Sequence, residues 1–411
     1  MNNINKIYET FGSNICLFPY MAGFYSLVST HLDSTPMLAP CSSIRVNGWD
    51  IKDNSLISSI NSEQWKELRR TFVSNGSCHT TDFCKTCSLA ETNSGDSPRK
   101  INNEYFAEHL LSDIIKQVQE IIDNDYKVEK ILSLDYCPSN YCNYECIMCF
   151  SGASTKRREI ERILFMEQHP EAGKPPKNQP LFAPTDDFYQ TIDQLEILNL
   201  TGGETLLQKQ VHEIIDYLVS RDLAKNITIS LLTNVSKYPT DLLDKFKKFK
   251  NVFYTLSIDG VGEIIEYQRR GAVWADIESN ALRFQQDIGC VVNYVLTGVN
   301  VFGFVEFIDW VAKHNIDQIF ISLVYDRNRN ISVAVIPPEL KMPLLEKLYA
   351  CKISYAGTAY ESLIIQVIGI LENTKHDPDL ISEFVKAIKI EDRFSKKKLI
   401  EIVTEWAPYF K

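Results

Sequence analysis

The sequence predicts an α/β protein built around an open, partial (β/α)6 barrel of the TIM type, with an irregular cysteine-rich region before it and helices after it. Between residues 130 and 324, short and continuously apolar runs recur, as expected of strands that are buried on both faces. Helical patterns separate most of these runs. Repeated strand–helix units with short links build a parallel sheet, and six units are too few to close an eight-stranded barrel.

The elements are expected in the following order. Residues 1–100 carry short apolar pieces separated by Ser, Asn, Gly and Pro, which predicts irregular chain. Apolar residues at helical spacing from Lys100 to Lys127 predict one long helix. The strands are expected at Lys130–Asp135, Leu195–Leu200, Ile227–Leu232, Val252–Ile258, Val291–Leu296 and Gln318–Val324. The helices between them are expected at Leu207–Val219, Asp241–Phe249, Trp274–Gln286 and Val305–His314.

The stretch His169–Pro184 is rich in Pro, Gly and Lys and predicts an exposed loop within the first crossover. Beyond residue 331, terminal helices are expected, with Pro343 at the first position of its helix, where a missing N–H costs nothing. These helices are expected at Pro343–Ala350, Glu361–Leu371 and Ile381–Ile390. The predicted domains are a cysteine-rich accessory domain at 1–100, a linking helix at 101–129, the barrel at 130–330 and a helical region at 331–411.

Composition limits the function classes. A formal net charge of −10 argues against a general nucleic-acid surface, which needs excess basic charge to neutralise phosphates. The opening residues lack the basic start and apolar stretch of a secretory signal, and no apolar run is long enough to span a bilayer. We therefore expect a cytoplasmic protein that does not bind membranes. In that reducing compartment, the 11 cysteines favour metal or cluster binding over disulfides.

Three cysteines follow the first predicted strand closely. Cys142, Cys146 and Cys149 are spaced Cys-x3-Cys-x2-Cys. Three thiolates in one loop can hold three irons of a cubane and leave the fourth iron open for another ligand. A zinc knuckle is the alternative, but zinc usually takes a fourth protein ligand, and this loop offers only Cys137.

The spacing resembles the signature loop of radical S-adenosylmethionine (SAM) enzymes. The resemblance implies a [4Fe–4S] cluster whose open iron binds the methionine end of SAM. Residues Gly202, Gly203 and Glu204 end the second predicted strand and resemble the Gly-Gly-Glu motif of the family. Glu204 is therefore expected to accept hydrogen bonds from the cofactor's ammonium group.

Further positions carry the same resemblance. Polar residues end the third and fourth strands, where the ribose and the methionine carboxylate are expected: Thr233, Asn234, Ser257 and Asp259. Met148 occupies the place where relatives often carry an aromatic residue beside adenine. Either Arg269 or Arg270 is expected to meet the cofactor's carboxylate, with Arg269 preferred, and Asn300 is a weaker polar candidate.

A second group of cysteines precedes the barrel. It resembles the accessory-cluster regions of the SPASM and twitch subfamilies, although in them the region commonly follows the barrel. The resemblance implies that Cys16, Cys41, Cys84 and Cys87 ligate a second iron–sulfur cluster. Cys78 is close enough in sequence to replace Cys16, and a zinc site built from the same thiolates is the alternative.

The function implied by the resemblance is reductive cleavage of SAM to a 5′-deoxyadenosyl radical. This radical abstracts a hydrogen from a peptide or small-metabolite substrate, leading to oxidation, crosslinking or epimerisation. An electron donor such as flavodoxin or ferredoxin is the expected partner. The alternatives are a sulfur-inserting radical SAM enzyme and a non-catalytic zinc-binding interaction protein.

Overall fold

The computed structural model describes residues 3–27, 36–41, 51, 53–74, 84–85, 87–88, 91, 97–110, 112–171, 183–324 and 330–411. The chain divides into two compact units. The first unit comprises Met1–Tyr141, Pro175–Leu231 and Asp241–Val252. The second unit comprises Cys142–Lys174, Leu232–Thr240 and Phe253–Lys411.

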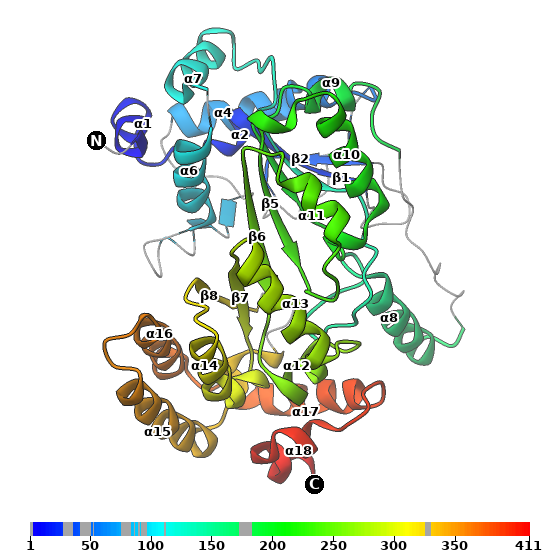
Figure 1. Cartoon of the computed structure of the whole chain (residues 1–411), viewed down its shortest axis with the longest axis vertical. Coiled ribbons are helices and arrows are strands. Elements are labelled where there is room, and N and C mark those ends of the chain that lie inside the picture. Colours follow the sequence, from blue (N-terminus) through cyan, green and yellow to red (C-terminus); the bar gives the residue numbers. More distant parts are fainter. Residues whose placement is uncertain are drawn as a thin grey trace. The chain divides into compact units, whose positions relative to one another are not determined.

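The sheet of the first unit has its strands in the order β2-β1-β3-β4-β5. Figure 1 labels β1, β2 and β5 among them. These strands are β1 (Ala22–Ser26), β2 (Met37–Ala39), β3 (Ser133–Cys137), β4 (Ile197–Leu200) and β5 (Thr228–Thr233). The β1–β2 pair is antiparallel, whereas β1 with β3, β3 with β4 and β4 with β5 are parallel. The last two residues of β5 begin a segment of the second unit.

The register of this sheet separates an apolar face from a polar one. Leu134 lies opposite Leu198, which lies opposite Ile229, and all three side chains are fully buried. On the other face, Asp135 lies opposite Asn199. The Asn199 side chain donates a hydrogen bond to the Asp135 carboxylate, with a nitrogen–oxygen distance of 2.7 Å. One face therefore forms hydrophobic core, while the other holds a polar pair of buried Asp135 and partly buried Asn199.

Helices and short 3-10 turns surround these strands. In the first unit they are α1 (Asn3–Phe11), α2 (Phe18–Met21), α3 (Leu56–Ile60), α4 (Glu63–Ser74), α6 (Pro98–His109), α7 (Ile114–Asp123), α9 (Phe188–Ile192), η3 (Thr205–Leu207), α10 (Lys209–Ser220), η4 (Ala224–Asn226) and α11 (Thr240–Phe246).

The second unit contains a parallel sheet in the order β6-β7-β8. Its strands are β6 (Asn251–Ser257), β7 (Val291–Leu296) and β8 (Ile319–Leu323). Its helices and turns are α8 (Thr155–Gln168), α12 (Gly262–Gln268), α13 (Trp274–Asp287), η5 (Asn300–Gly303), α14 (Phe304–Lys313), η7 (Val333–Val335), α15 (Pro338–Ser354), α16 (Ala359–Asn373), α17 (Pro378–Asp392), α18 (Leu399–Ile402) and η8 (Thr404–Phe410).

All six strands predicted from the apolar runs are present as β3 to β8, and the predicted α/β class is confirmed. The prediction of irregular chain over residues 1–100 is wrong for the part that the structure describes, because that part forms helices and the strands β1 and β2. Helix α4 was missed because Arg69 interrupts the apolar stripe of Trp65, Leu68 and Phe72. Arg69 is itself fully buried and donates hydrogen bonds to the carbonyls of Pro19, Ile60 and Tyr126.

Two helix boundaries also differ from the predictions. The single helix expected from Lys100 to Lys127 is two helices, because Asp113 starts α7 by accepting a hydrogen bond from the backbone N–H of Lys116 at 3.1 Å. Pro343 does not begin its helix. Pro338 takes the first turn of α15, and Pro343 lies inside it. The loop expected at His169–Pro184 falls mostly outside the described residues.

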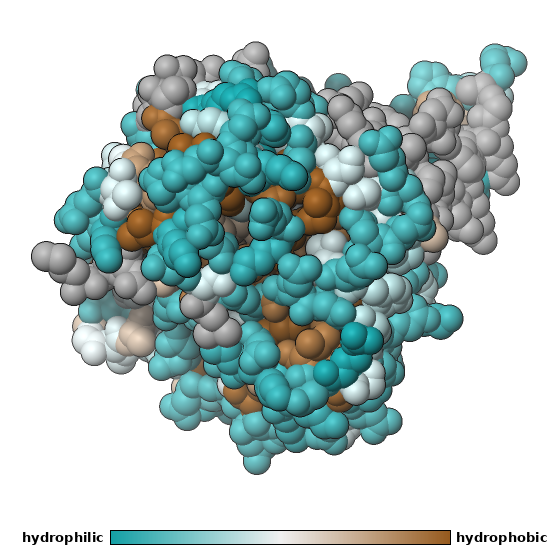
Figure 2. Space-filling view, turned by 90° about the horizontal axis from the view of Figure 1, so that it is seen from above, coloured by the Kyte–Doolittle hydropathy of each residue, from teal (hydrophilic) through white to brown (hydrophobic). Residues whose placement is uncertain are grey.

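The face of the molecule seen in Figure 2 is mostly hydrophilic, with smaller apolar areas between the polar side chains. Among the described residues, no helix combines the length and the apolar character that crossing a bilayer requires.

Candidate iron–sulfur and cofactor site

The loop that carries Cys142, Cys146 and Cys149 belongs to the second unit and is fixed there by backbone hydrogen bonds. The N–H of Glu145 donates to the carbonyl of Arg270 at 2.8 Å, and the N–H of Ile147 donates to the carbonyl of Gln268 at 3.0 Å. These two bonds tie the middle of the loop to the end of α12.

Helix α8 starts directly after the loop and supports it from the other side. Ser154 caps α8 by accepting a hydrogen bond from the N–H of Arg157 at 3.1 Å. The same Ser154 hydroxyl donates to the carbonyl of Tyr144 at 2.8 Å. The Thr155 hydroxyl lies 3.3 Å from both the N–H and the carbonyl oxygen of Cys142. The capping residues of α8 therefore also set the position of the loop.

The cysteine sulfurs are approached by nitrogen donors. The backbone nitrogen of Tyr144 lies 3.5 Å from Sγ of Cys142, and Nδ2 of Asn234 lies 3.8 Å from the same sulfur. Nη1 of Arg269 lies 3.9 Å from Sγ of Cys146. Donors of this kind stabilise thiolates and tune the potential of an iron–sulfur cluster. Burial raises the pKa of Cys146, and the Arg269 guanidinium is the strongest influence that lowers it.

Arg269 is held by the carboxylate of Asp259. Its Nε lies 2.6 Å from Oδ2 of Asp259, an electrostatic contact rather than a well-aligned hydrogen bond. The second oxygen of Asp259 accepts a hydrogen bond from the N–H of Val295 at 2.8 Å. Asp259 is fully buried, and its carboxylate faces Arg269 and β7. Asp259 therefore influences the cysteine loop by holding Arg269 beside Cys146.

The turn after β5 brings Asn234 to the loop. Besides its contact with Cys142, the Asn234 amide donates to Oδ1 of Asn143 at 2.9 Å. The next residue, Val235, has φ +63°, a conformation that a β-branched side chain seldom adopts. The Thr233 hydroxyl, which accepts from the N–H of Val235 at 3.1 Å, helps to hold this turn. The strained residue Val235 thus directly follows Asn234, which contacts Cys142.

The Gly-Gly-Glu turn lies in the first unit and packs on the chain that leads into the cysteine loop. A Cβ on Gly203 would lie 2.1 Å from the carbonyl oxygen of Tyr141, and one on Gly202 would lie 2.3 Å from that of Ser139. The backbone N–H of Glu204 donates to Tyr141 at 2.8 Å. The Glu204 side chain is buried and accepts from the N–H of Leu206 at 3.2 Å. Both positions require glycine, because a Cβ at either one would overlap the backbone of Ser139 or Tyr141.

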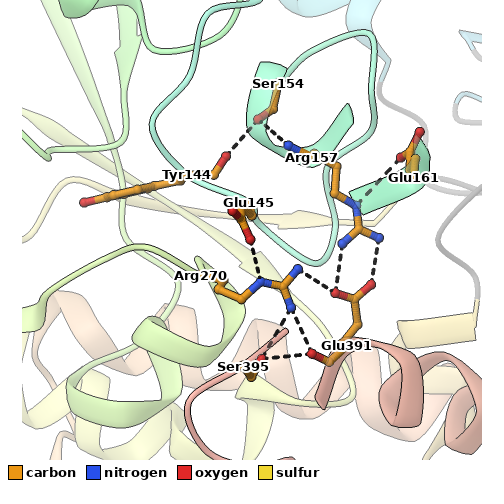
Figure 3. Close-up of polar contacts among 8 residues, drawn as sticks. All are labelled: Tyr144, Glu145, Ser154, Arg157, Glu161, Arg270, Glu391 and Ser395. Atoms are coloured by element: carbon orange, nitrogen blue, oxygen red, sulfur yellow. Dashed lines mark hydrogen bonds and ion pairs between the residues drawn. The ribbon is translucent and has the colours of Figure 1, made fainter. Parts of the chain in front are cut away.

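A charged network that was not predicted contacts the cysteine loop at Glu145 (Figure 3). Glu391 of α17 pairs with Arg157 through two hydrogen bonds of 2.8 and 2.7 Å, and with Arg270 at 3.0 Å. Arg270 also pairs with Glu145 of the loop at 3.0 Å. The sequence did contain a signal, because Glu391 continues the buried stripe of Leu380, Phe384 and Ile388.

The N-terminal cysteines form a separate group within the first unit. Burial raises the pKa of Cys16 well above its usual range, and the neighbouring thiols of Cys41, Cys84 and Cys87 raise it further. Cys41, Cys84 and Cys87 therefore each lie near Cys16. Cys78, the alternative ligand, lies outside the described residues.

Arg99 links the two parts of this cysteine group. It is buried and donates hydrogen bonds of 2.8 Å to the carbonyls of Ser13 and Ile15, just before Cys16. Its other nitrogens pair with the carboxylate of Glu91 at 2.9 Å, shortly after Cys87. One guanidinium thus joins the chain around Cys16 to the chain around Cys87.

The comparison with protein families decides the class of the central region. A sequence model described as the Radical SAM superfamily matches residues 136–311. The chain contains a radical SAM domain. The match lies within the predicted barrel and confirms the predicted superfamily for residues 136–311. Radical SAM domains use a [4Fe–4S] cluster and SAM, so both are implied for this chain.

Solved structures are similar to this chain at low sequence identity. "Native anSMEcpe with bound AdoMet" is 16% identical with a TM-score of 0.39, covering 62% of this chain and 66% of that one. The Streptococcus suis protein SuiB bound to S-adenosylmethionine is 17% identical with a TM-score of 0.35, covering 69% and 61%. This chain therefore spans slightly less than two thirds of the length of these structures. A search of curated proteins found no match.

The structure brings together part of the predicted site of the radical SAM domain. Asn234, Asp259 and Arg269 join the cysteine loop in the second unit. Thr233, Ser257 and the partly buried Met148 belong to the same unit. Asn300 binds the backbone of Asp259 and Val295 and is wholly buried, so it is part of the scaffold. The role of these residues in cofactor binding remains a prediction.

Proposed function

We propose that this chain is an enzyme that holds a [4Fe–4S] cluster on Cys142, Cys146 and Cys149 and cleaves SAM reductively. The observation that carries the proposal is the donor set of the loop. Three thiols within a radical SAM domain are accompanied by N–H groups directed at the sulfurs of Cys142 and Cys146. This set fits a cubane with one iron left open to a cofactor.

The alternative to a cluster is a single metal ion held by the same thiols. In a cubane each thiolate binds a different iron, whereas one zinc ion draws its ligands to a single centre and usually takes four of them. Three thiols in one loop suit the cubane, because its fourth iron then stays open for the cofactor.

The chain's own residues would prepare the site in two ways. The N–H groups of Tyr144 and Asn234 stabilise negative charge on Cys142, and Arg269 does so on Cys146. Burial of these groups keeps water from the sulfurs and strengthens each interaction. When bound, the cluster and SAM supply the one-electron chemistry that the side chains lack.

We further propose a second iron–sulfur cluster on Cys16, Cys41, Cys84 and Cys87. The proximity of Cys41, Cys84 and Cys87 to Cys16 supports it, as does the Arg99 bridge that fixes two parts of the group. Together with the resemblance to accessory-cluster regions, this supports a peptide or small-metabolite substrate that undergoes oxidation, crosslinking or epimerisation. A flavodoxin-like or ferredoxin-like protein would supply the electron.

The test is anaerobic reconstitution with iron and sulfide, followed by reduction in the presence of SAM. We expect iron and acid-labile sulfide for two cubanes, and release of 5′-deoxyadenosine that depends on the reductant. Stoichiometric zinc without sulfide would instead establish the zinc-binding protein. Loss of the accessory sulfide during turnover would establish sulfur insertion.

A further inference from the structure

The Glu391 network brings two buried guanidinium groups onto one buried carboxylate. The side chains of Arg157, Arg270 and Glu391 retain 10%, 9% and 8% of their accessible surface. Two guanidinium groups thus share one carboxylate in a largely dehydrated space. The close-up view places the Glu391 carboxylate between them (Figure 3). Arg270 also pairs with Glu145 and Arg157 with Glu161, at 3.0 and 3.7 Å, but these two carboxylates are more exposed. Loss of the Glu391 carboxylate would leave both guanidinium groups without their buried counter-ion, which is costly.

Each of the two arginines reaches the cysteine loop by its own route. Arg270 pairs with the Glu145 carboxylate at 3.0 Å, and its carbonyl accepts the N–H of the same residue. Arg157 lies in the first turn of α8, and its own N–H is bonded to Ser154, which holds the carbonyl of Tyr144. Glu391 pairs with both arginines and so connects these two sets of contacts.

Helix α17 and the residues after it are attached to this region by further contacts. The backbone carbonyl of Glu391 accepts from Arg270 at 3.0 Å, and the ring of Phe394 lies beneath the same guanidinium at 5.6 Å. Arg393 pairs with Glu167 near the end of α8. Helices α8 and α17 are therefore joined at two points along α8.

We infer that Glu391 is a positioning residue for the radical cluster: by neutralising Arg157 and Arg270 together, it fixes the cysteine loop in the shape that presents three thiolates to iron. It touches neither cysteine nor cofactor and acts only through the two arginines. The role of Glu391 in cluster binding rests on the proposed function. The claim that Glu391 holds the loop in place rests on the contacts alone.

The first test uses metal-free protein and amide hydrogen exchange. The variant is Glu391→Gln, which keeps the size of the side chain and removes its charge. Its matched control is Glu383→Gln, the same change at an exposed position of α17. We expect the N–H groups of Glu145 and Ile147 to exchange at least tenfold faster in Glu391→Gln, while amides of α10 and α14 keep their protection.

The second test uses protein reconstituted with iron. Glu391→Gln should lose the iron of the radical cluster several-fold faster during exposure to a chelator, whereas Glu383→Gln should match the wild type. A second variant, Glu391→Asp, retains the charge but is too short to pair with both arginines. Glu391→Asp should give values between those of Glu391→Gln and the wild type in both measurements. It replaces Glu391→Gln as the test variant if that protein does not fold.

The outcomes separate the two proposals. Loop exchange and iron loss equal to those of the control, with α10 and α14 protected, would overturn the role of Glu391. Equal loss of protection in the loop and in α14 would also overturn it, because Glu391 would then support only the fold. A wild type that binds no cluster would instead defeat the proposed function, while the exchange experiment would still report whether Glu391 holds the loop.

Discussion

Nε of Arg269 lies 2.6 Å from Oδ2 of Asp259, and both side chains are buried. The sequence suggested that both residues contact SAM. The structure pairs them with each other and places the outer nitrogen of Arg269 beside Cys146. Asp259 is therefore the counter-ion that favours the charged form of Arg269 beside Cys146.

Removing this carboxylate should be costly. In Asp259→Asn, Arg269 would keep its buried charge without a counter-ion, and we expect the free energy of unfolding to fall by about 3–5 kcal/mol. Urea denaturation measures the change. Asp222→Asn removes an exposed partner of Lys225 and should have little effect. Equal effects of the two substitutions would show that the buried Arg269–Asp259 pair stabilises the protein no more than the exposed Lys225–Asp222 pair does.

The three loop cysteines should be individually essential. Replacing Cys142, Cys146 or Cys149 by Ala removes one of three iron ligands. Each variant should lose one cubane's iron and release no 5′-deoxyadenosine. Iron analysis and chromatography of reduced reaction mixtures measure both effects. Cys290→Ala, away from the loop, should retain wild-type values. Continued 5′-deoxyadenosine release by a loop variant would refute the assignment of that cysteine.

The Gly-Gly-Glu turn should tolerate no side chain at Gly203. An added Cβ would lie 2.1 Å from the carbonyl oxygen of Tyr141, so backbone must move on one side. We expect Gly203→Ala to lower the free energy of unfolding by about 1–3 kcal/mol and to reduce cluster retention. The control is Gly369→Ala within α16, where no atom lies within 4 Å, and it should stabilise the protein slightly. A fully stable Gly203→Ala protein would contradict the contact.

Asp135 should make stability depend on pH. Burial raises its pKa from 3.8 to about 6, although the hydrogen bond from Asn199 opposes the shift. Because the folded state keeps the proton to a higher pH than the unfolded state, this residue's contribution to stability falls as pH rises from about 4 to about 6. Above that range its cost is constant, on the order of 3 kcal/mol.

Asp135→Asn should remove this cost. The difference in unfolding free energy between the variant and the wild type should therefore increase across pH 4–6 and then level off. Denaturation curves at several pH values measure it, and the subtraction cancels the other carboxylates. A difference that does not change with pH would show that Asp135 titrates normally.

Arg99 should be needed for the accessory cysteines but not for the radical cluster. Arg99→Lys cannot bridge Glu91 and the two carbonyls before Cys16 at once, since Lys has a single nitrogen. We expect the variant to reconstitute about half the iron and sulfide of the wild type and still to cleave SAM slowly. Arg221→Lys, at an exposed ion pair, is the control. Full iron content in Arg99→Lys would argue against this bridge.

Local patterns were sufficient to predict β3 to β8 and the cysteine loop. The spacing of Cys142, Cys146 and Cys149 is confined to a few residues, and β7 occupies the predicted range Val291–Leu296. Arg69 shows why α4 was missed, because a charged residue on a buried face disguises a helical stripe. The Glu391 network could not be predicted, since Arg157 and Glu391 are 234 residues apart and neither matches a motif.

That separation has a consequence for biosynthesis. The ribosome completes the cysteine loop and both of its arginines well before it reaches Glu391. Until α17 emerges, the nascent chain carries two guanidinium groups without the shared carboxylate that allows them to be buried together. A chain that stops short of α17 would retain every cysteine of the signature and still lack the anchor of its loop. Iron loading of the intact protein should therefore follow translation rather than accompany it.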